Sequence, residues 1–390
     1  ELAPATPYWP SSAHGGAFPH QANAGTTSYY GVGAYLRPLE DVRRSELRFA
    51  TECLAFANIP GAAALARMPG GVAAREQHPG WKQRSPRDLG AGWDFDDVRD
   101  HYLQLLFQTD PQRLRAVDHE RYLALGRLAT AEVMAASFAD WRRPGSSCNG
   151  ALVLMLRDLW AGAGWGLVDD AGAPKACWHS LKRVLQPLTL FITDEGVNGL
   201  FVHVVNESGH PQTVEVELDA WRSGDVQVAA GRQTVTIAAR GAHSVAAVRM
   251  LDYFMDLGYA YRFGPLPCEV VVATLRSAGG VQLARAFHFP GGLSAAAEAD
   301  VGLAADIVAV GEDAVEVCLR TRRLALGVHF DIPGFTADDE HFHLPPGSDA
   351  RVTLRGAGLL PPGGRVHAVN SVTPARIMPA AGPQRRQKSE

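Results

Sequence analysis

The chain has 390 residues, of which 46% are hydrophobic and 20% are charged, and its formal net charge at pH 7 is -4. This length predicts two or three domains. The small net charge argues against a surface for nucleic acid or anionic lipid. No stretch approaches the roughly 18 to 20 uncharged apolar residues of a membrane helix, so we expect neither nucleic-acid nor membrane partners.

Residues 1 to 90 are rich in Gly, Pro and Ser, as in "WPSSAHGGAFPHQANAGTT", and predict long loops. Within them, the apolar run Phe49-Ala50-Thr51 predicts a short buried strand that ends at Glu52. Long loops on a scaffold often carry binding residues. All but one of the tryptophans also precede residue 180, which places the chemistry in the first half of the chain.

From Asp94 onward the pattern becomes helical. The segment "DFDDVRDHYLQLLF" has acidic residues in its first turn, and the next segment offers Asp110 as a cap with Pro111 at the first helical position. We expect these helices to lie on the surface over a sheet. The continuous apolar run from Ala151 to Leu156 predicts a strand buried on both faces of a parallel sheet, so this region is α/β in character.

After Pro187 the sequence changes to short alternating segments separated by Gly, Asn and Ser, such as "GLFVHVVNES" and "TVEVELDAW". This pattern is typical of β-sandwiches. We expect one sandwich over residues 186–250, a second over residues 251–375, and a disordered tail over residues 376–390.

The chain contains five cysteines: Cys53, Cys148, Cys177, Cys268 and Cys318. Their odd number, wide spacing and lack of a C-x-x-C pair fit reduced thiols better than a disulfide framework or a zinc site. We therefore expect a reducing compartment and a cytoplasmic protein.

Five segments occur in an order that carries a family resemblance: "PYWPSS", "YYGVGAYLRPLEDVRRSELRFATECLAFANIPG", "GALVLMLRDLW", "GWGLVDDAGAPKACWHSLKR" and "DEHFHLPPG". Together they resemble the carboxyl-terminal half of bacterial β-mannosidases of glycoside hydrolase family 2. The resemblance implies that residues 1–185 are the second half of a TIM (β/α)8 barrel, followed by immunoglobulin-like sandwiches. It also implies exo-acting, retaining hydrolysis of terminal β-mannosides without a cofactor.

In that family the carboxylate of a "SEFGFQS"-type motif is the nucleophile, and it falls on Glu52 of "TECLAFAN". Active-site groups of TIM barrels stand at the carboxyl ends of strands, where the predicted strand ends. On the local sequence alone, without the resemblance, Glu52 could instead be a strand-end glutamate in an ion pair with Arg48 or Arg157. The ordered segments favour the nucleophile.

A retaining glycosidase needs a second carboxyl group as acid/base, roughly 5 to 5.5 Å from the first. The resemblance implies that this group is the glutamate of an "NE" motif upstream of "PYWPSS". The pair Asn206-Glu207 lies in the sandwich region and is interpreted as a hairpin turn. We therefore expect the chain to lack the upstream acid/base half.

Five residues are candidates for substrate binding: Trp9, Tyr30, Arg157, Asp158 and Trp160. For each aromatic residue taken singly, core packing is the alternative. The family's "WQLND" is here "LMLRD", so Leu154 replaces a tryptophan while Asp158 remains. The sugar and its linkage therefore stay open.

Two further alternatives come from the sequence. His341 and His343, two apart beside Asp338 and Glu340, could bind a metal from one face of a strand, but a solvated sandwich edge is the preferred interpretation, so no metal is expected. As an alternative function, the chain could be a non-catalytic carbohydrate-binding or structural protein with a degenerate barrel remnant. The oligomeric state is not predicted.

Overall fold

The computed structural model describes residues 5–73, 75–311, 313–356 and 362–378. The chain divides into two compact units. The first runs to Trp221 and continues over Gln227–Leu293, and the second comprises Arg222–Val226 and the chain from Ser294 onward. Among the described helices, none combines the length and apolar character needed to cross a bilayer.

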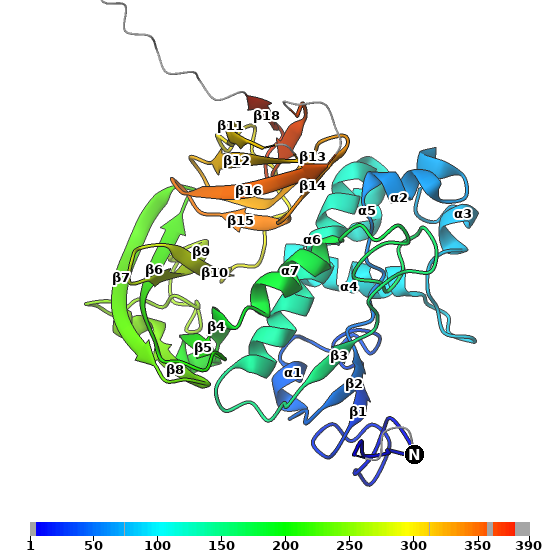
Figure 1. Ribbon diagram of the computed structural model, residues 1–390, viewed down its shortest axis with the longest axis horizontal. Helices are drawn as coiled ribbons and strands as arrows, with labels where there is room; N and C mark the ends of the chain where they lie inside the picture. Colours follow the sequence, from blue (N-terminus) through cyan, green and yellow to red (C-terminus); the bar gives the residue numbers. More distant parts are fainter. Residues whose placement is uncertain (1–4, 74, 312, 357–361, 379–390) are drawn as a thin grey trace, which may run out of the picture. The chain divides into compact units, whose positions relative to one another are not determined.

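The first unit begins with a three-stranded parallel sheet, whose strands β1 (Thr27–Tyr29), β2 (Ala50–Cys53) and β3 (Ala151–Val153) lie in that order (Figure 1). Tyr29 is paired with Cys53, and both are buried. The Tyr29 ring packs edge-on against Trp141 of helix α6 (His119–Arg142), with the ring centroids 5.8 Å apart. One face of the sheet is therefore packed against a helix.

The prediction of a strand from Ala151 to Leu156 buried on both faces is wrong. Strand β3 is three residues long, and the side chains of Leu152 and Leu156 are 56% and 63% exposed. Apolar residues on consecutive positions point to opposite faces of a strand, and here only one face has a helix against it among the described residues. The apolar run thus covers a short strand with exposed Leu152 and a following segment with exposed Leu156.

The helices follow the predicted capping signals. The Asp110 carboxylate accepts hydrogen bonds from the backbone N–H groups of Gln112 and Arg113, and Pro111 opens the helix. Asp94 and Asp97 form a capping box at the start of the preceding helix, α4 (Phe95–Phe107). The helices are α1 (Asp41–Arg44), α2 (Ala62–Arg67), α3 (Pro79–Lys82), α4 (Phe95–Phe107), α5 (Pro111–Val117), α6 (His119–Arg142) and α7 (Ala176–Val184), with 3-10 turns η1 (Gly71–Ala73), η2 (Gly196–Asn198) and η3 (Ala247–Met250).

Helix α6 is not the surface helix that the sequence suggested. Leu125, Leu128, Ala129 and Met134 of this helix are fully buried. In Figure 1 α6 runs beside α7, and both belong to the first unit. The apolar residues of α6 are buried between neighbouring elements, which a pattern read one helix at a time does not reveal.

A buried ionic network stabilises this region. Arg99 of α4 is fully buried, and its guanidinium contacts Glu76 at 2.7 Å, Asp96 at 2.8 Å and Asp100 at 3.2 Å. Burial raises the pKa of Glu76. Burial also acts to raise the pKa of Asp96, but Arg99 and Lys82 outweigh it and hold that pKa below its ordinary value. The network therefore depends on the Arg99 cation.

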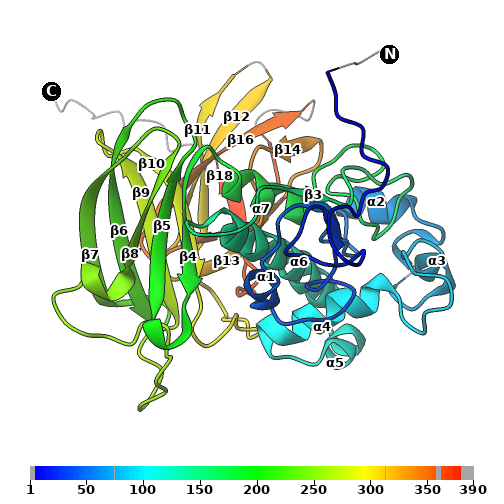
Figure 2. The same cartoon turned by 90° about the horizontal axis from the view of Figure 1, so that it is seen from below.

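The rest of the first unit is a β-sandwich of two sheets, which face each other in Figure 2. Strands β9 (Val270–Ser277) and β10 (Gln282–His288) pair with each other, and β9 pairs with β6 (Gln212–Arg222). They therefore complete this sandwich, although the sequence analysis placed them in the next one. The first sandwich accordingly includes β9 and β10 instead of ending at residue 250, and it belongs to the unit that runs to Leu293. The sheets have the orders β4-β5-β8 and β10-β9-β6-β7, with β4 (Leu188–Asp194), β5 (Leu200–Asn206), β6 (Gln212–Arg222), β7 (Val226–Ile237), β8 (Gly241–Ala246), β9 (Val270–Ser277) and β10 (Gln282–His288).

The second unit is all β and has its own apolar core, which includes Val317, Val328, Leu344 and Leu354. Residues 376–378 of the expected disordered tail belong to its last strand, and residues 379–390 lie outside the described residues. Its strands have the order β14-β16-β12-β11-β18-β17-β13-β15, with β11 (Ala304–Val310), β12 (Ala314–Arg320), β13 (Ala325–Asp331), β14 (Phe335–Ala337), β15 (Phe342–Leu344), β16 (Asp349–Gly356), β17 (Arg365–His367) and β18 (Ala375–Met378).

Candidate active site

Glu52 lies at the carboxyl-terminal end of β2, and Tyr30 follows directly after β1. Because these neighbouring strands are parallel, their carboxyl ends meet at one edge of the sheet. There the Tyr30 hydroxyl donates a hydrogen bond of 2.7 Å to Glu52 Oε2. Burial and the adjacent Glu52 carboxylate raise the pKa of Tyr30, so the phenol stays protonated and acts as a donor.

The ion pairs considered for Glu52 do not form. Arg48 donates through Nε to the carbonyl oxygen of Asn23, and Arg157 donates through Nη2 to that of Asp170. Within the described part of the chain, Glu52 has a phenol as its partner and no cation. The local alternative of an ion pair with Arg48 or Arg157 is therefore wrong, and the role of Glu52 as the nucleophile stays a prediction.

Asp158 is buried, and both of its carboxylate oxygens are engaged inside the protein. Lys175 Nζ lies 2.5 Å from Oδ2, and the Gly166 N–H donates to Oδ1 at 2.7 Å. Burial raises the pKa of Asp158, and the Lys175 ammonium opposes that shift. In this structure Asp158 ties the segment after β3 to the residues around Gly166. Its contact with a substrate stays a prediction.

Sequence reasoning missed Lys175 and Asn58, which complete this arrangement. Lys175 is buried, and its ammonium also donates to the carbonyl oxygens of Asn58 at 2.8 Å and Gly164 at 3.3 Å. The Asn58 amide in turn donates to the carbonyl oxygen of Trp165. The isolated position of Lys175 among apolar residues in "APKACW" could have indicated a buried ammonium group. Its partners could not be predicted, because they are far away in the sequence.

Arg157 and Trp160 lie on the segment after β3 and are exposed. The Trp160 side chain is 50% exposed, and the Arg84 guanidinium lies 5.5 Å from the centroid of its ring. Core packing therefore does not explain Trp160. An exposed indole beside a cation offers a flat apolar surface with polar groups around it.

Trp9 is also exposed, at 61%, and packs against the His14 ring with the centroids 4.4 Å apart. Its segment reaches β2, because the Thr51 hydroxyl donates to the carbonyl oxygen of Ser12 at 3.3 Å. Of the five predicted binding residues, Tyr30 is the one that is hydrogen-bonded to Glu52 within the described ranges. The roles of the other four stay predictions.

The histidine pair does not share a strand face. His341 precedes β15 in a left-handed conformation (φ 54°), whereas His343 lies within the strand. Both are buried, so the preferred interpretation as a solvated edge is also wrong. In the part of the chain that the structure describes, no group of three or more His, Cys, Asp or Glu residues is arranged to hold a metal.

No protein-family model matches the chain. Among curated proteins, β-mannosidase B of Aspergillus fumigatus is 24% identical over 283 residues, a match that covers 67% of this chain and 32% of that enzyme. β-Mannosidase B of Aspergillus niger is 26% identical over 184 residues, covering 42% of this chain and 22% of the enzyme. Among solved structures, the β-D-mannosidase of Dictyoglomus thermophilum matches with a TM-score of 0.75 and 15% identity, over 96% of this chain and 43% of that one.

The chain resembles the carboxyl-terminal part of family 2 β-mannosidases. A second fold match, the exo-chitosanase CsxA of Amycolatopsis orientalis, has a TM-score of 0.62 and 15% identity over 83% of this chain and 42% of that chain. The predicted resemblance is confirmed, and the similar proteins are glycosidases. The chain spans about a third of the length of the curated relatives it matches.

Proposed function

We propose that this chain is the carboxyl-terminal part of a retaining, exo-acting β-mannosidase in which Glu52 is the nucleophile. The observation that carries the proposal is the Tyr30–Glu52 hydrogen bond at the carboxyl ends of two parallel strands. Similarity to β-mannosidases over 67% of the chain supports the reaction class.

The geometry suits a double displacement. Tyr30 holds Glu52 Oε2, so Oε1 is the oxygen that attacks the anomeric carbon. The bond from that carbon to the leaving oxygen breaks, a general acid gives this oxygen its proton, and a glycosyl ester forms on Glu52. The same group then takes a proton from water, which attacks the anomeric carbon and releases the sugar and the Glu52 carboxylate.

We also propose that the acid/base and the first half of the TIM barrel lie outside these 390 residues. Two observations support this. The match covers only 32% of the first curated relative, and two apolar residues, Leu152 of β3 and Leu156 in the segment after it, are exposed. Apolar side chains at these positions would be buried by further barrel strands.

Covalent trapping tests the nucleophile. An activated fluoro-mannoside should label Glu52 in a form of the protein extended upstream through the proposed acid/base. The Glu52→Gln variant should fold, take up no label and lose turnover, because the amide keeps the shape of the side chain without its nucleophilic charge. A label on another peptide would show that Glu52 is misassigned. Saturable binding of mannobiose without any label or turnover would favour the non-catalytic carbohydrate-binding protein.

A cytoplasmic location is part of this proposal. All five cysteines are free, and Cys53, Cys177, Cys268 and Cys318 are buried. Burial raises the pKa of Cys177 to about 12 and that of Cys268 to about 12, so these thiols stay protonated. Cell fractionation with antibody detection is the direct test, and recovery in the culture medium would contradict the proposal.

A further inference from the structure

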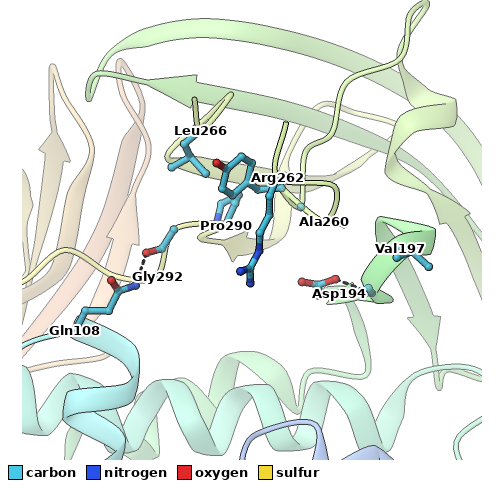
Figure 3. Close-up of a pocket in the computed structure, with 12 residues that line it drawn as sticks. Gln108, Asp194, Val197, Ala260, Arg262, Leu266, Pro290 and Gly292 are labelled. Carbon is cyan, nitrogen blue, oxygen red and sulfur yellow. Dashed lines mark hydrogen bonds between the residues drawn. The ribbon is translucent and has the colours of Figure 1, made fainter. Parts of the chain in front are cut away.

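A hollow lies in the first unit, and its lining does not include Glu52. It has a volume of about 760 Å³, within the range of about 300 to 1,000 Å³ usual for small-ligand sites. Figure 3 shows Gln108 at the end of α4, Asp194 at the end of β4, and Arg262 in the loop that precedes β9. Residues far apart in the sequence thus converge on one cavity.

The loop that carries Arg262 is held in a defined shape. Tyr259 and Arg262 both line the cavity, and both have a left-handed backbone (φ 54°). The Asp256 carboxylate accepts hydrogen bonds of 2.9 Å from the N–H groups of Ala260 and Tyr261. Non-glycine residues adopt this conformation at a cost, and such strain is concentrated at functional sites. A loop fixed before binding also loses less entropy when a ligand arrives.

Two opposite charges face the cavity without forming an ion pair with each other. In Figure 3 the Arg262 guanidinium and the Asp194 carboxylate point toward each other across the cavity. They are too far apart to form an ion pair, and Arg262 makes no hydrogen bond with any residue that the structure describes. One oxygen of Asp194 accepts the Gly196 N–H at 2.8 Å. The other oxygen and the guanidinium remain available to a ligand.

This pair selects the chemistry of the ligand. A simple anion would be repelled by Asp194 and a simple cation by Arg262, whereas neighbouring hydroxyl groups can donate to the carboxylate and accept from the guanidinium. Tyr259 adds an aromatic ring to the lining, and a ring can pack against the apolar face of a sugar. We propose that the cavity binds a neutral hexose unit of an oligosaccharide, as a second sugar site.

Exposed aromatic residues beside the cavity fit the same ligand. Tyr261 and Phe263 are 45% and 86% exposed, and their rings are nearly parallel with centroids 6.2 Å apart. The Tyr261 hydroxyl donates to the carbonyl oxygen of Val197, a cavity residue, at 3.0 Å. These rings offer apolar surface for further sugar units. The proposal is independent of Glu52, because the site would hold a glycan whether or not the chain is catalytic.

Calorimetric titration of the 390-residue chain with mannotriose tests the site. We expect saturable binding at millimolar sugar concentrations, weakened about tenfold or more in the Arg262→Ala and Asp194→Ala variants, because each loses a hydrogen bond to a charged group. Arg232→Ala is the matched control, since Arg232 is an exposed arginine of the same sandwich that does not line the cavity. It should bind as tightly as the parent, and so should Glu52→Gln.

Three results would overturn the proposal. The first is no binding by the parent chain, and the second is binding that both cavity variants retain. The third is binding lost in Glu52→Gln, which would assign the sugar to the active site instead. Sulfate, titrated in parallel, should give no saturable heat, and binding of sulfate without mannotriose would identify an anion site. Unchanged thermal midpoints of the variants would show that any loss of binding is local.

Discussion

Tyr30 donates its phenolic hydrogen to Glu52 Oε2 across a distance of 2.7 Å. The bond joins residues at the ends of two parallel strands and holds one carboxylate oxygen in a fixed direction. Removing it in Tyr30→Phe should lower kcat for an activated aryl β-mannoside by about 10- to 100-fold, with a smaller change in KM. The measurement is steady-state kinetics on the protein extended upstream through the proposed acid/base.

Tyr29→Phe is the matched control for this prediction. The neighbouring Tyr29 is buried on the helix-covered side and donates to Asp41 Oδ2 at 2.8 Å. Its loss should lower the thermal midpoint and leave kcat nearly unchanged. Equal kinetic effects from both variants would mean that Tyr30 acts only through stability.

Lys175→Met should destabilise the first unit by about 3 to 5 kcal/mol, because it leaves the buried Asp158 carboxylate without its cation. The same change should loosen the segment that carries Trp160 and so raise KM. Chemical denaturation and substrate kinetics measure the two effects. Lys182→Met, at an exposed position of α7, serves as the control. A wild-type KM in Lys175→Met would show that Asp158 does not position this segment.

Arg99→Met should be among the most damaging substitutions in the helical region, again by about 3 to 5 kcal/mol. It leaves Glu76, Asp96 and Asp100 close together around a missing cation. The exposed Arg113 of α5 provides the control, Arg113→Met, which should stay within about 0.5 kcal/mol of the parent. Similar urea midpoints for the two variants would contradict a structural role for the network.

Acid should destabilise the first sandwich through His203. This residue is buried between Thr193 and Ser244, at 2.8 and 2.7 Å, and burial lowers its pKa to about 4. The unfolded chain, with a histidine pKa of about 6.5, binds more protons than the native state between these values. Stability should therefore fall as the pH is lowered from about 6.5 to about 4, by up to about 1.4 kcal/mol per pH unit from this site.

The His203→Gln variant should flatten that slope when urea midpoints are measured across this pH window. His210→Gln, at an exposed position in the turn after β5, should leave the slope as in the parent. An unchanged slope in His203→Gln would remove His203 as the cause.

Local signals in the sequence predicted local structure well. Asp110 and Pro111 mark the start of α5 because a side-chain cap and a proline act within a single turn. Alternating segments after Pro187 form strands because side chains alternate between the faces of a strand. The ordered motifs also pointed to Glu52, whose position at the end of β2 the structure reproduces.

Tertiary structure decided which distant elements meet. The pairing of β9 with β6 assigned both to one sandwich, although alternation is the same whichever sheet a strand joins. The tertiary structure also buries Lys175 against Asp158 and leaves Leu152 of β3 exposed. The sequence by itself determined caps and strands, since these depend on neighbouring residues, whereas the candidate nucleophile came from the resemblance to family 2 β-mannosidases and stays a prediction. Sheet partners, buried ion pairs and the cavity lined by Asp194 and Arg262 depend on contacts across many residues, which local patterns do not encode.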